Sequence, residues 1–178
     1  TADGHVFNSQ GTAMSAVWTF HLLTTTLHSK TLFIGNSYVY YNAGIHNYYA
    51  SIANAHLHAN EPVHAHARAL PNYYLRQHVS DGQPPRGEDW STIVLQEQSQ
   101  APALPQIEPE YAASKTACAK LAVDAHVHNG ARCIVLLQTW GRRDGDLESI
   151  ELCPSFVAMQ ARLSAGYESL ADEARAAL

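Results

Sequence analysis

Short apolar runs alternate with longer segments of helical periodicity along most of the chain. Four of the runs are bounded by polar or turn residues and predict strands. The predicted strands are 32–35, 63–70, 92–95 and 134–137. The third and fourth are continuous runs rich in Val, Ile and Leu, which is typical of strands buried on both faces.

Helices are predicted between and after these strands. The predicted helical segments are 43–58, 74–79, 109–128 and one that begins after Ser155 as its N-cap. Pro109 suits the first turn of its helix, and Gly130 suits the C-terminal cap of the same helix. In the last helix, apolar positions recur every three or four residues, so we expect one buried face. These positions are Phe156, Met159, Leu163, Tyr167, Leu170 and Ala174.

The alternation of strands and helices predicts an α/β fold. Right-handed crossovers between successive strands give a parallel sheet with helices on both faces. A chain of 178 residues is expected to form one domain. We place that domain at 30–178 and expect residues 1–29 to form an N-terminal arm that packs on the domain or on a partner. The apolar part of this arm, 16–27, is too short and too polar to span a membrane.

Composition and charge exclude several classes of function. With 46% hydrophobic and 15% charged residues, the chain is typical of a globular rather than a disordered protein. The net charge of −5 leaves no basic footprint for nucleic acid. The 11 histidines would reverse the sign of the charge if all were protonated, which predicts pH-dependent solubility or association. The sequence has no glycine-rich phosphate-binding loop, so we expect neither a nucleotide nor another cofactor.

Histidines and cysteines are the candidate metal ligands and redox groups. His64 and His66 share one face of a predicted strand with Arg68, whose positive charge disfavours a metal ion between the two imidazoles. We therefore expect structural or surface histidines and no metal site. The three cysteines cannot all pair within the chain; a disulfide between Cys133 and Cys153 and buried free thiols both remain open.

A serine follows the first predicted strand directly. Residues 31–38 have the sequence TLFIGNSY, which raises the Ser37 hydroxyl to the carboxyl edge of the sheet at the start of a helical segment. Backbone N–H groups and the helix dipole at such a position can stabilise a developing oxyanion. Ligands of parallel sheets bind beyond the carboxyl ends of the strands. Polar residues also gather at the other strand ends, 72–73, 96–99 and 139–144.

Three segments together resemble the SGNH (GDSL-type) hydrolase superfamily, and more narrowly a branch with Gly-Asn-Ser in place of Gly-Asp-Ser. They are FIGNSY at 33–38, IVLQEQSQ at 93–100 and LQTWGRRDGD at 137–146. The similarity covers the chain from about residue 31 to its C-terminus. It implies a flavodoxin-like three-layer α/β/α sandwich and the hydrolysis of a small acyl or acetyl ester, for example on a carbohydrate.

The same resemblance implies roles for individual residues. Ser37 would be the nucleophile, and its own N–H would be one oxyanion donor. Gln98 stands where the family has an Asn and would be the side-chain donor. Asn72 stands near the family's glycine and would offer a backbone N–H, although without the conformational freedom of glycine. The residues expected to line the substrate cleft are Asn36, Tyr38 and Trp140.

Several of these residues admit a second interpretation. Tyr38 fits an aromatic wall beside Ser37 and fits core packing equally well, whereas Tyr41, Tyr48 and the other tyrosines are expected to pack in the core. The charged residues in 142–146 fit either a cleft-shaping loop or an internally paired, solvated loop. Glu97 directly follows a buried strand and is expected to be a hydrogen-bonded structural residue.

The sequence departs from the family at its catalytic acid and base. The family places Asp-x-x-His after its last helix, and this motif does not occur in the chain. A serine without its base is a weak nucleophile at neutral pH. We therefore expect either a fragment or a protein that has lost the dyad, with His78 as the best positioned substitute. The predicted function is an SGNH-type ester hydrolase domain that is inactive in this form. The alternative is a non-catalytic structural or interaction subunit of a larger assembly.

Overall fold

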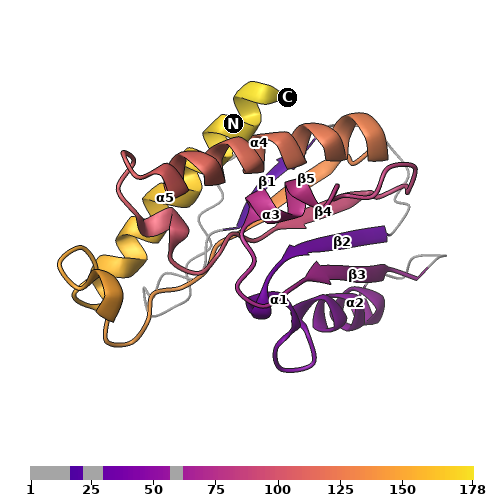
Figure 1. Cartoon of the computed structure of the whole chain (residues 1–178). Helices are drawn as coiled ribbons and strands as arrows, with labels where there is room; N and C mark the ends of the chain where they lie inside the picture. Colours follow the sequence, from indigo (N-terminus) through magenta and orange to yellow (C-terminus); the bar gives the residue numbers. More distant parts are fainter. Residues whose placement is uncertain (1–16, 22–29, 57–61) are drawn as a thin grey trace.

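Five strands form one sheet in the middle of the protein (Figure 1). The computed structural model describes residues 17–21, 30–56 and 62–178. The strands are β1 Val17–His21, β2 Lys30–Gly35, β3 His64–Ala69, β4 Thr92–Leu95 and β5 Cys133–Leu137. The helices are α1 Ser37–Tyr40, α2 Ile45–His56, α3 Leu75–Ser80, α4 Pro109–Asn129 and α5 Phe156–Ala177, with 3-10 turns η1 Ala101–Ala103 and η2 Leu147–Ser149. The strand order is β1-β5-β4-β2-β3, and β2 to β5 are parallel, which confirms the predicted α/β fold.

Strand β1 was not predicted from the sequence. It pairs antiparallel with β5, from Val17 opposite Leu137 to His21 opposite Cys133, so the sheet is mixed rather than wholly parallel. Because β1 lies within 1–29, part of the expected arm belongs to the sheet. The rest of the arm lies outside the described residues.

The two faces of the sheet differ in how completely helices cover them. What we call the first face packs against α3, α4 and α5, and each of its six main side chains is 1% exposed or less. These side chains are Leu32, Ile34, Ile93, Leu95, Ile134 and Leu136. The second face packs against α1 and α2, and its residues on β5 are only partly buried. Its strand residues are Phe33, Val94, Val135, Leu137, Ala65, Ala67 and Ala69.

The two long helices begin and end close to their predicted bounds. Pro109 stands in the first turn of α4, and Gly130 adopts a left-handed φ of 64° at its C-terminal cap. The hydroxyl of Ser155 accepts a hydrogen bond from the Ala158 N–H at the start of α5 (3.2 Å). The predicted buried face of α5 is confirmed except at Phe156, which is 45% exposed. The buried face begins one turn later, in a separate cluster below the loop that precedes the helix.

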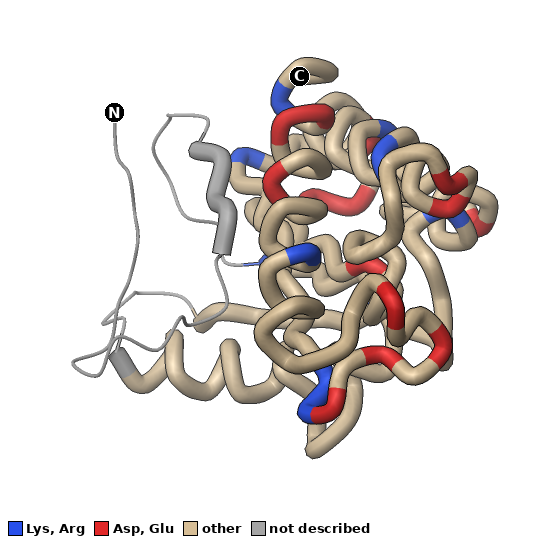
Figure 2. Tube along the Cα trace, turned by 90° about the vertical axis from the view of Figure 1, so that its left-hand side faces the viewer, with Lys and Arg blue, Asp and Glu red and all other residues tan. Residues whose placement is uncertain are grey.

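The helix predicted over 43–58 is confirmed as α2, which begins two residues later; residues 57 and 58 lie outside the described residues. The one-turn helix α1 is followed by three residues with positive φ, which interrupt the helical path before α2 begins. The sequence of α2 contains no Asp, Glu, Lys or Arg, and Figure 2 shows this helix free of charge beside the more highly charged remainder. Tyr41 and Tyr48 are 66% and 55% exposed, so the expectation that they pack in the core is wrong. The reason is that α2 packs on the sheet through one face, where Ile45 and Tyr49 contact Phe33 of β2, while Tyr48 and the preceding Tyr41 stay largely accessible to solvent.

The histidine and cysteine predictions have mixed outcomes. His64, His66 and Arg68 lie on one exposed face of β3, as expected. All three cysteines are free, so the disulfide between Cys133 and Cys153 is not formed. In the described part of the chain, no helix is long and apolar enough to cross a membrane, and no cluster of His, Cys, Asp and Glu could hold a metal ion.

Candidate functional site

The candidate site lies at the carboxyl edge of the four parallel strands. β2 leads into Ser37, β3 into the turn at 70–73, β4 into the segment 96–100 and β5 into the loop 138–146. Parallel strands end at the same edge, so these four polar segments are neighbours in space although they lie up to about a hundred residues apart in the sequence.

Ser37 is the first residue of the one-turn helix α1. Its side chain is partly exposed, and its hydroxyl makes no hydrogen bond with any residue that the structure describes. The backbone N–H of Ser37 is likewise unpaired within the described residues, as is normal for the first turn of a helix. A single turn carries little macrodipole, so any oxyanion stabilisation here would come from individual N–H groups.

Asn36 fixes the turn that presents Ser37. Its N–H donates to the Gln96 Oε1 (3.0 Å), its Nδ2 donates to the Tyr73 carbonyl oxygen (3.0 Å), and its Oδ1 accepts from the Tyr38 N–H (3.3 Å). Asn36 is 2% exposed, so its side chain holds the framework of the site. Gly35 is required beside it, because a Cβ there would lie 2.8 Å from a Val39 methyl carbon and would also meet the Gln96 side chain.

Asn72 has the backbone conformation that a glycine would adopt easily. Its φ is 57°, in the left-handed region that Asn tolerates better than most residues. The Tyr73 N–H donates to the Leu70 carbonyl oxygen (3.3 Å), which closes the turn around Asn72. Asn72 is exposed, and its own N–H makes no hydrogen bond with the described residues. The absence of glycine in this segment is therefore compatible with the turn.

Glu97 connects two of the loops at this edge. One carboxylate oxygen accepts from the Gln98 N–H (2.7 Å) and from the Leu75 N–H at the start of α3 (3.0 Å). The side chain is fully buried, and burial raises the pKa of Glu97, while the two N–H donors partly offset the shift. The interpretation of Glu97 as a hydrogen-bonded structural residue agrees with these contacts.

Only the oxygen of the Gln98 side-chain amide is hydrogen-bonded within the described chain. Its Oε1 accepts from the N–H of Gln100 (2.9 Å) and from the N–H of Ala101 (3.3 Å), and so caps the start of η1. Its Nε2 makes no hydrogen bond with the described residues. An amide held by its oxygen presents a fixed donor, which is the arrangement that a side-chain oxyanion donor needs.

His78 has a different position from the one that a substitute base would need. Its Nε2 lies 2.8 Å from the Gly35 carbonyl oxygen, and its ring packs edge-on against Tyr73 (centroids 5.0 Å apart). The imidazole is 2% exposed, and burial lowers its pKa, with Gly35 and Asp81 opposing the shift. His78 is therefore neutral near pH 7 and ties α3 to β2. Its contacts do not include Ser37.

Tyr38 and Trp140 form one wall at the same edge. Their rings pack edge to face with centroids 4.6 Å apart, and Trp140 is 51% exposed. The loop behind Trp140 is held internally by a pair between Arg142 and the buried Asp146 (2.5 Å). The second guanidinium nitrogen of Arg142 donates to the Gln100 Oε1 (2.5 Å), which connects this loop to η1. The loop is thus internally paired and also attached to the neighbouring segment.

Sequence reasoning did not identify the polar framework beneath the site. Gln96 is 1% exposed and accepts from the Asn36 N–H, and Gln100 joins η1 to the loop after β5. The signal was present, because five consecutive polar residues follow the buried strand β4 directly. Five polar residues at the end of a buried strand must find partners, and here the partners come from the neighbouring strand ends.

The comparisons with known proteins support the fold. No family model and no curated protein sequence matches the chain. A solved structure of a catalytic variant of Axe2, an acetylxylan esterase from Geobacillus stearothermophilus, is similar, with a TM-score of 0.58 and 10% identity. The match covers 86% of this chain and 74% of that chain. A second Axe2 variant, described as an acetyl-xylooligosaccharide esterase, has a TM-score of 0.57 and 10% identity over 84% of this chain and 73% of its own.

Proposed function

We propose that this protein is an esterase-type domain in which Ser37 attacks the carbonyl carbon of a small acyl ester, such as an acetylated carbohydrate. The observation that carries the proposal is the Ser37 hydroxyl, which has no hydrogen bond to a described residue and stands at the edge where α/β sheets bind ligands. The fold that the chain shares with acetylxylan esterases supports the choice of an acetyl ester.

In the proposed reaction, the Ser37 Oγ forms a bond to the carbonyl carbon as its proton passes to water or to an added base. The carbonyl oxygen becomes an oxyanion, for which the N–H groups of Ser37 and Asn72 and the Gln98 amide are the candidate donors. The alcohol then leaves with a proton, and water hydrolyses the acyl-serine. One oxyanion donor contributes about 10²–10³ in rate in related chemistry.

The step that lacks a partner in the described chain is removal of the serine proton. Among the residues that the structure describes, no imidazole or carboxylate makes a hydrogen bond with the Ser37 hydroxyl. This observation favours a second candidate function, a non-catalytic interaction subunit, and predicts slow acylation of Ser37 by this chain on its own. An added base should therefore distinguish the two candidates.

The test is labelling by a fluorophosphonate probe, followed by intact-protein mass, with and without imidazole in the buffer. We expect slow labelling of the natural sequence, acceleration of at least about fivefold by imidazole, and no labelling of Ser37→Ala. Ser51→Ala, which removes an exposed hydroxyl on α2, is the matched control and should label like the natural sequence.

Each other outcome changes the proposal. Absence of labelling even with imidazole would mean that Ser37 is not an accessible nucleophile, and the interaction subunit would replace the esterase. Rapid labelling without imidazole would mean that the chain supplies its own base. The esterase proposal would then stand, and the expectation of slow acylation would be wrong.

A further inference from the structure

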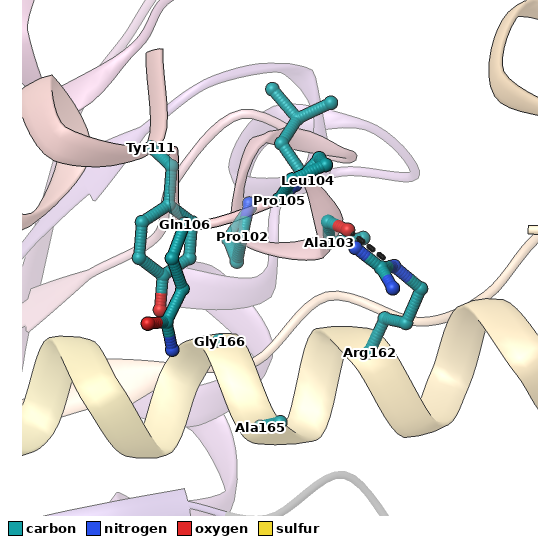
Figure 3. A pocket seen from close by; sticks show the side chains of 9 residues that line it. All are labelled: Pro102, Ala103, Leu104, Pro105, Gln106, Tyr111, Arg162, Ala165 and Gly166. Carbon is teal, nitrogen blue, oxygen red and sulfur yellow. Dashed lines mark hydrogen bonds between the residues drawn. The ribbon is translucent and has the colours of Figure 1, made fainter. Parts of the chain in front are cut away.

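A cavity of about 220 Å³ lies between η1 and α5, and none of the residues that line it belongs to the candidate site (Figure 3). Its walls come from the proline-rich segment 102–106, from the first turn of α4 and from the middle of α5. The lining residues that matter for its chemistry are Tyr111, Arg162, Leu104 and Pro105. None of these was singled out as a candidate functional residue.

The cavity exists because the segment 102–106 rests, at its first residue, on a position of α5 that has no side chain. A Cβ on Gly166 would collide with the Pro102 carbonyl oxygen, so the backbone of the segment sits directly on α5 there. Beyond this contact the segment rises over Ala165, whose short side chain leaves the floor of the cavity open. The floor of the cavity is thus formed by Ala165 and Gly166 of α5, and its roof by the segment 102–106, which contains Pro102 and Pro105.

Arg162 supplies a positive charge on one side of the cavity. Its Nε donates to the Ala103 carbonyl oxygen (2.7 Å), which fixes the guanidinium beside the opening. The side chain is partly buried, and it forms no salt bridge with any carboxylate in the described chain. Arg142, in the loop after β5, is paired with Asp146, whereas Arg162 has no carboxylate partner among the described residues.

Tyr111 supplies a hydrogen-bonding group on the other side. The residue is 3% exposed, yet its hydroxyl makes no hydrogen bond with a described residue. Figure 3 shows the phenol extending from α4 toward the floor of the cavity, with the amide of Gln106 beside it and Arg162 opposite. The ring is buried while the hydroxyl oxygen remains accessible and has no partner among the described residues, so it is available to bond a ligand in the cavity.

We propose that this cavity binds a small monocarboxylate that has an apolar body. The carboxylate accepts hydrogen bonds from the free guanidinium nitrogens of Arg162, and the body lies against Leu104 and Pro105 with the Tyr111 hydroxyl at its polar edge. A single arginine in apolar surroundings suits one negative charge, whereas a phosphate dianion would need further cations. The volume is below the range of about 300–1,000 Å³ for drug-sized ligands, so the ligand is small.

The probes are phenylacetate, its neutral isostere phenylacetamide and phenyl phosphate, titrated by ¹⁵N–¹H NMR into the whole chain. We expect phenylacetate to bind with a Kd near the millimolar range and to shift the amide signals of η1 and of the middle of α5. Phenylacetamide and phenyl phosphate should each bind at least about tenfold more weakly. Equal binding of either control ligand, or no binding of phenylacetate at 20 mM or more (on the order of 20 times the expected Kd), would overturn the proposal.

Two variants test the proposed roles of Arg162 and Tyr111, and a third tests whether the ligand occupies this cavity. Arg162→Gln should weaken phenylacetate at least about tenfold, and Tyr111→Phe should weaken it several-fold, whereas Arg143→Gln removes an exposed charge paired with Asp144 and should change nothing. Because Arg162→Gln could loosen the roof, Ala165→Leu provides a second check: it fills the floor without touching the guanidinium and should also abolish binding.

The experiment separates this proposal from the proposed esterase function. Binding that is unchanged in Ser37→Ala supports a separate carboxylate site. Binding that is lost in Ser37→Ala, or unchanged in both Arg162→Gln and Ala165→Leu, would place the carboxylate elsewhere and would overturn the inference. Neither result depends on whether Ser37 is labelled by the fluorophosphonate.

Discussion

The two faces of the sheet show how differently one fold can be held on its two sides. The first face is sealed by three helices, and its six main side chains are essentially inaccessible. On the second face, α1 and α2 cover β2 and β3, while Val135 and Leu137 stay partly exposed. Because hydrophobic stabilisation follows the apolar area removed from water, most of the folding free energy should come from the first face.

The candidate site contains residues from both faces of the sheet. Ser37 begins α1 on the thinly covered side, whereas Glu97 and His78, which hold the surrounding loops, are buried on the well-covered side. The difference suggests that the framework of the site is rigid while its reactive group stands where substrate can approach. The following predictions test this division, beginning with the largest effect.

Neighbouring leucines on β5 give the most direct test. Leu136 points to the first face and is 1% exposed, and Leu137 points to the second face and is partly buried. We expect Leu136→Ala to lower the free energy of unfolding by about 3–4 kcal/mol, since it leaves a cavity in a closed core. Leu137→Ala should cost about 1 kcal/mol. Urea unfolding measures both, and equal losses would mean that the second face is covered as well as the first.

Glu97 tests the buried framework. Glu97→Ala leaves the N–H groups of Leu75 and Gln98 without their shared acceptor and should cost about 2–3 kcal/mol at pH 7. Glu97→Gln keeps an oxygen in place for both donors and serves as the matched control. A similar loss in both variants would show that the charge, not the shared acceptor, holds the two loops.

The same pair of proteins gives a pH dependence with a definite sign. Burial raises the pKa of Glu97 in the folded state above its ordinary value of 4.5, so the folded state binds this proton more tightly than the unfolded state. Stability therefore falls as pH rises from about 4.5 through the folded-state pKa, and the loss is constant above it. Glu97→Gln cannot lose a proton, so its advantage over the natural sequence should be largest above the folded-state pKa, shrink as pH falls from that pKa towards about 4.5, and be absent at lower pH. Unfolding titrations at several pH values measure this difference.

The aromatic wall tests the exposed part of the site. Tyr38 and Trp140 pack edge to face, but Trp140 is half exposed, so the coupling free energy should be near the lower end of 0.5–1.5 kcal/mol, about 0.5. A double-mutant cycle with Tyr38→Leu and Trp140→Leu measures it. Zero coupling would mean that the two rings do not contact each other in solution.

Most of the strands and long helices could be predicted because local signals agree with tertiary burial there. In β4 and β5 the apolar runs coincide with the core, and in α4 Pro109 and Gly130 mark the two ends. Strand β1 could not be predicted, because it is defined by its backbone pairing with β5. A five-residue segment of sequence does not show which strand it will pair with. The exposed tyrosines of α2 were missed for a related reason: periodicity shows a face but not what covers it.

For the candidate site, the strand ends could be predicted and the bonds between them could not. Ser37 and Gln98 follow directly from the strands that precede them. The bridge from Glu97 to Leu75 joins residues 22 positions apart, and it depends on where α3 begins relative to β4. Such contacts require the three-dimensional arrangement, which is why the role of Gln96 and the hydrogen-bond partners of Glu97 were known only from the structure.

Ser37→Ala is expected to have the smallest effect on stability and the largest effect on reactivity. The hydroxyl makes no hydrogen bond with the described residues and is partly exposed, so its removal should change the free energy of unfolding by less than about 0.5 kcal/mol. Urea unfolding measures this value on the same samples used for fluorophosphonate labelling. A loss above about 1.5 kcal/mol would mean that the hydroxyl is a buried structural group, and the thinly covered side would then share the rigidity of the other.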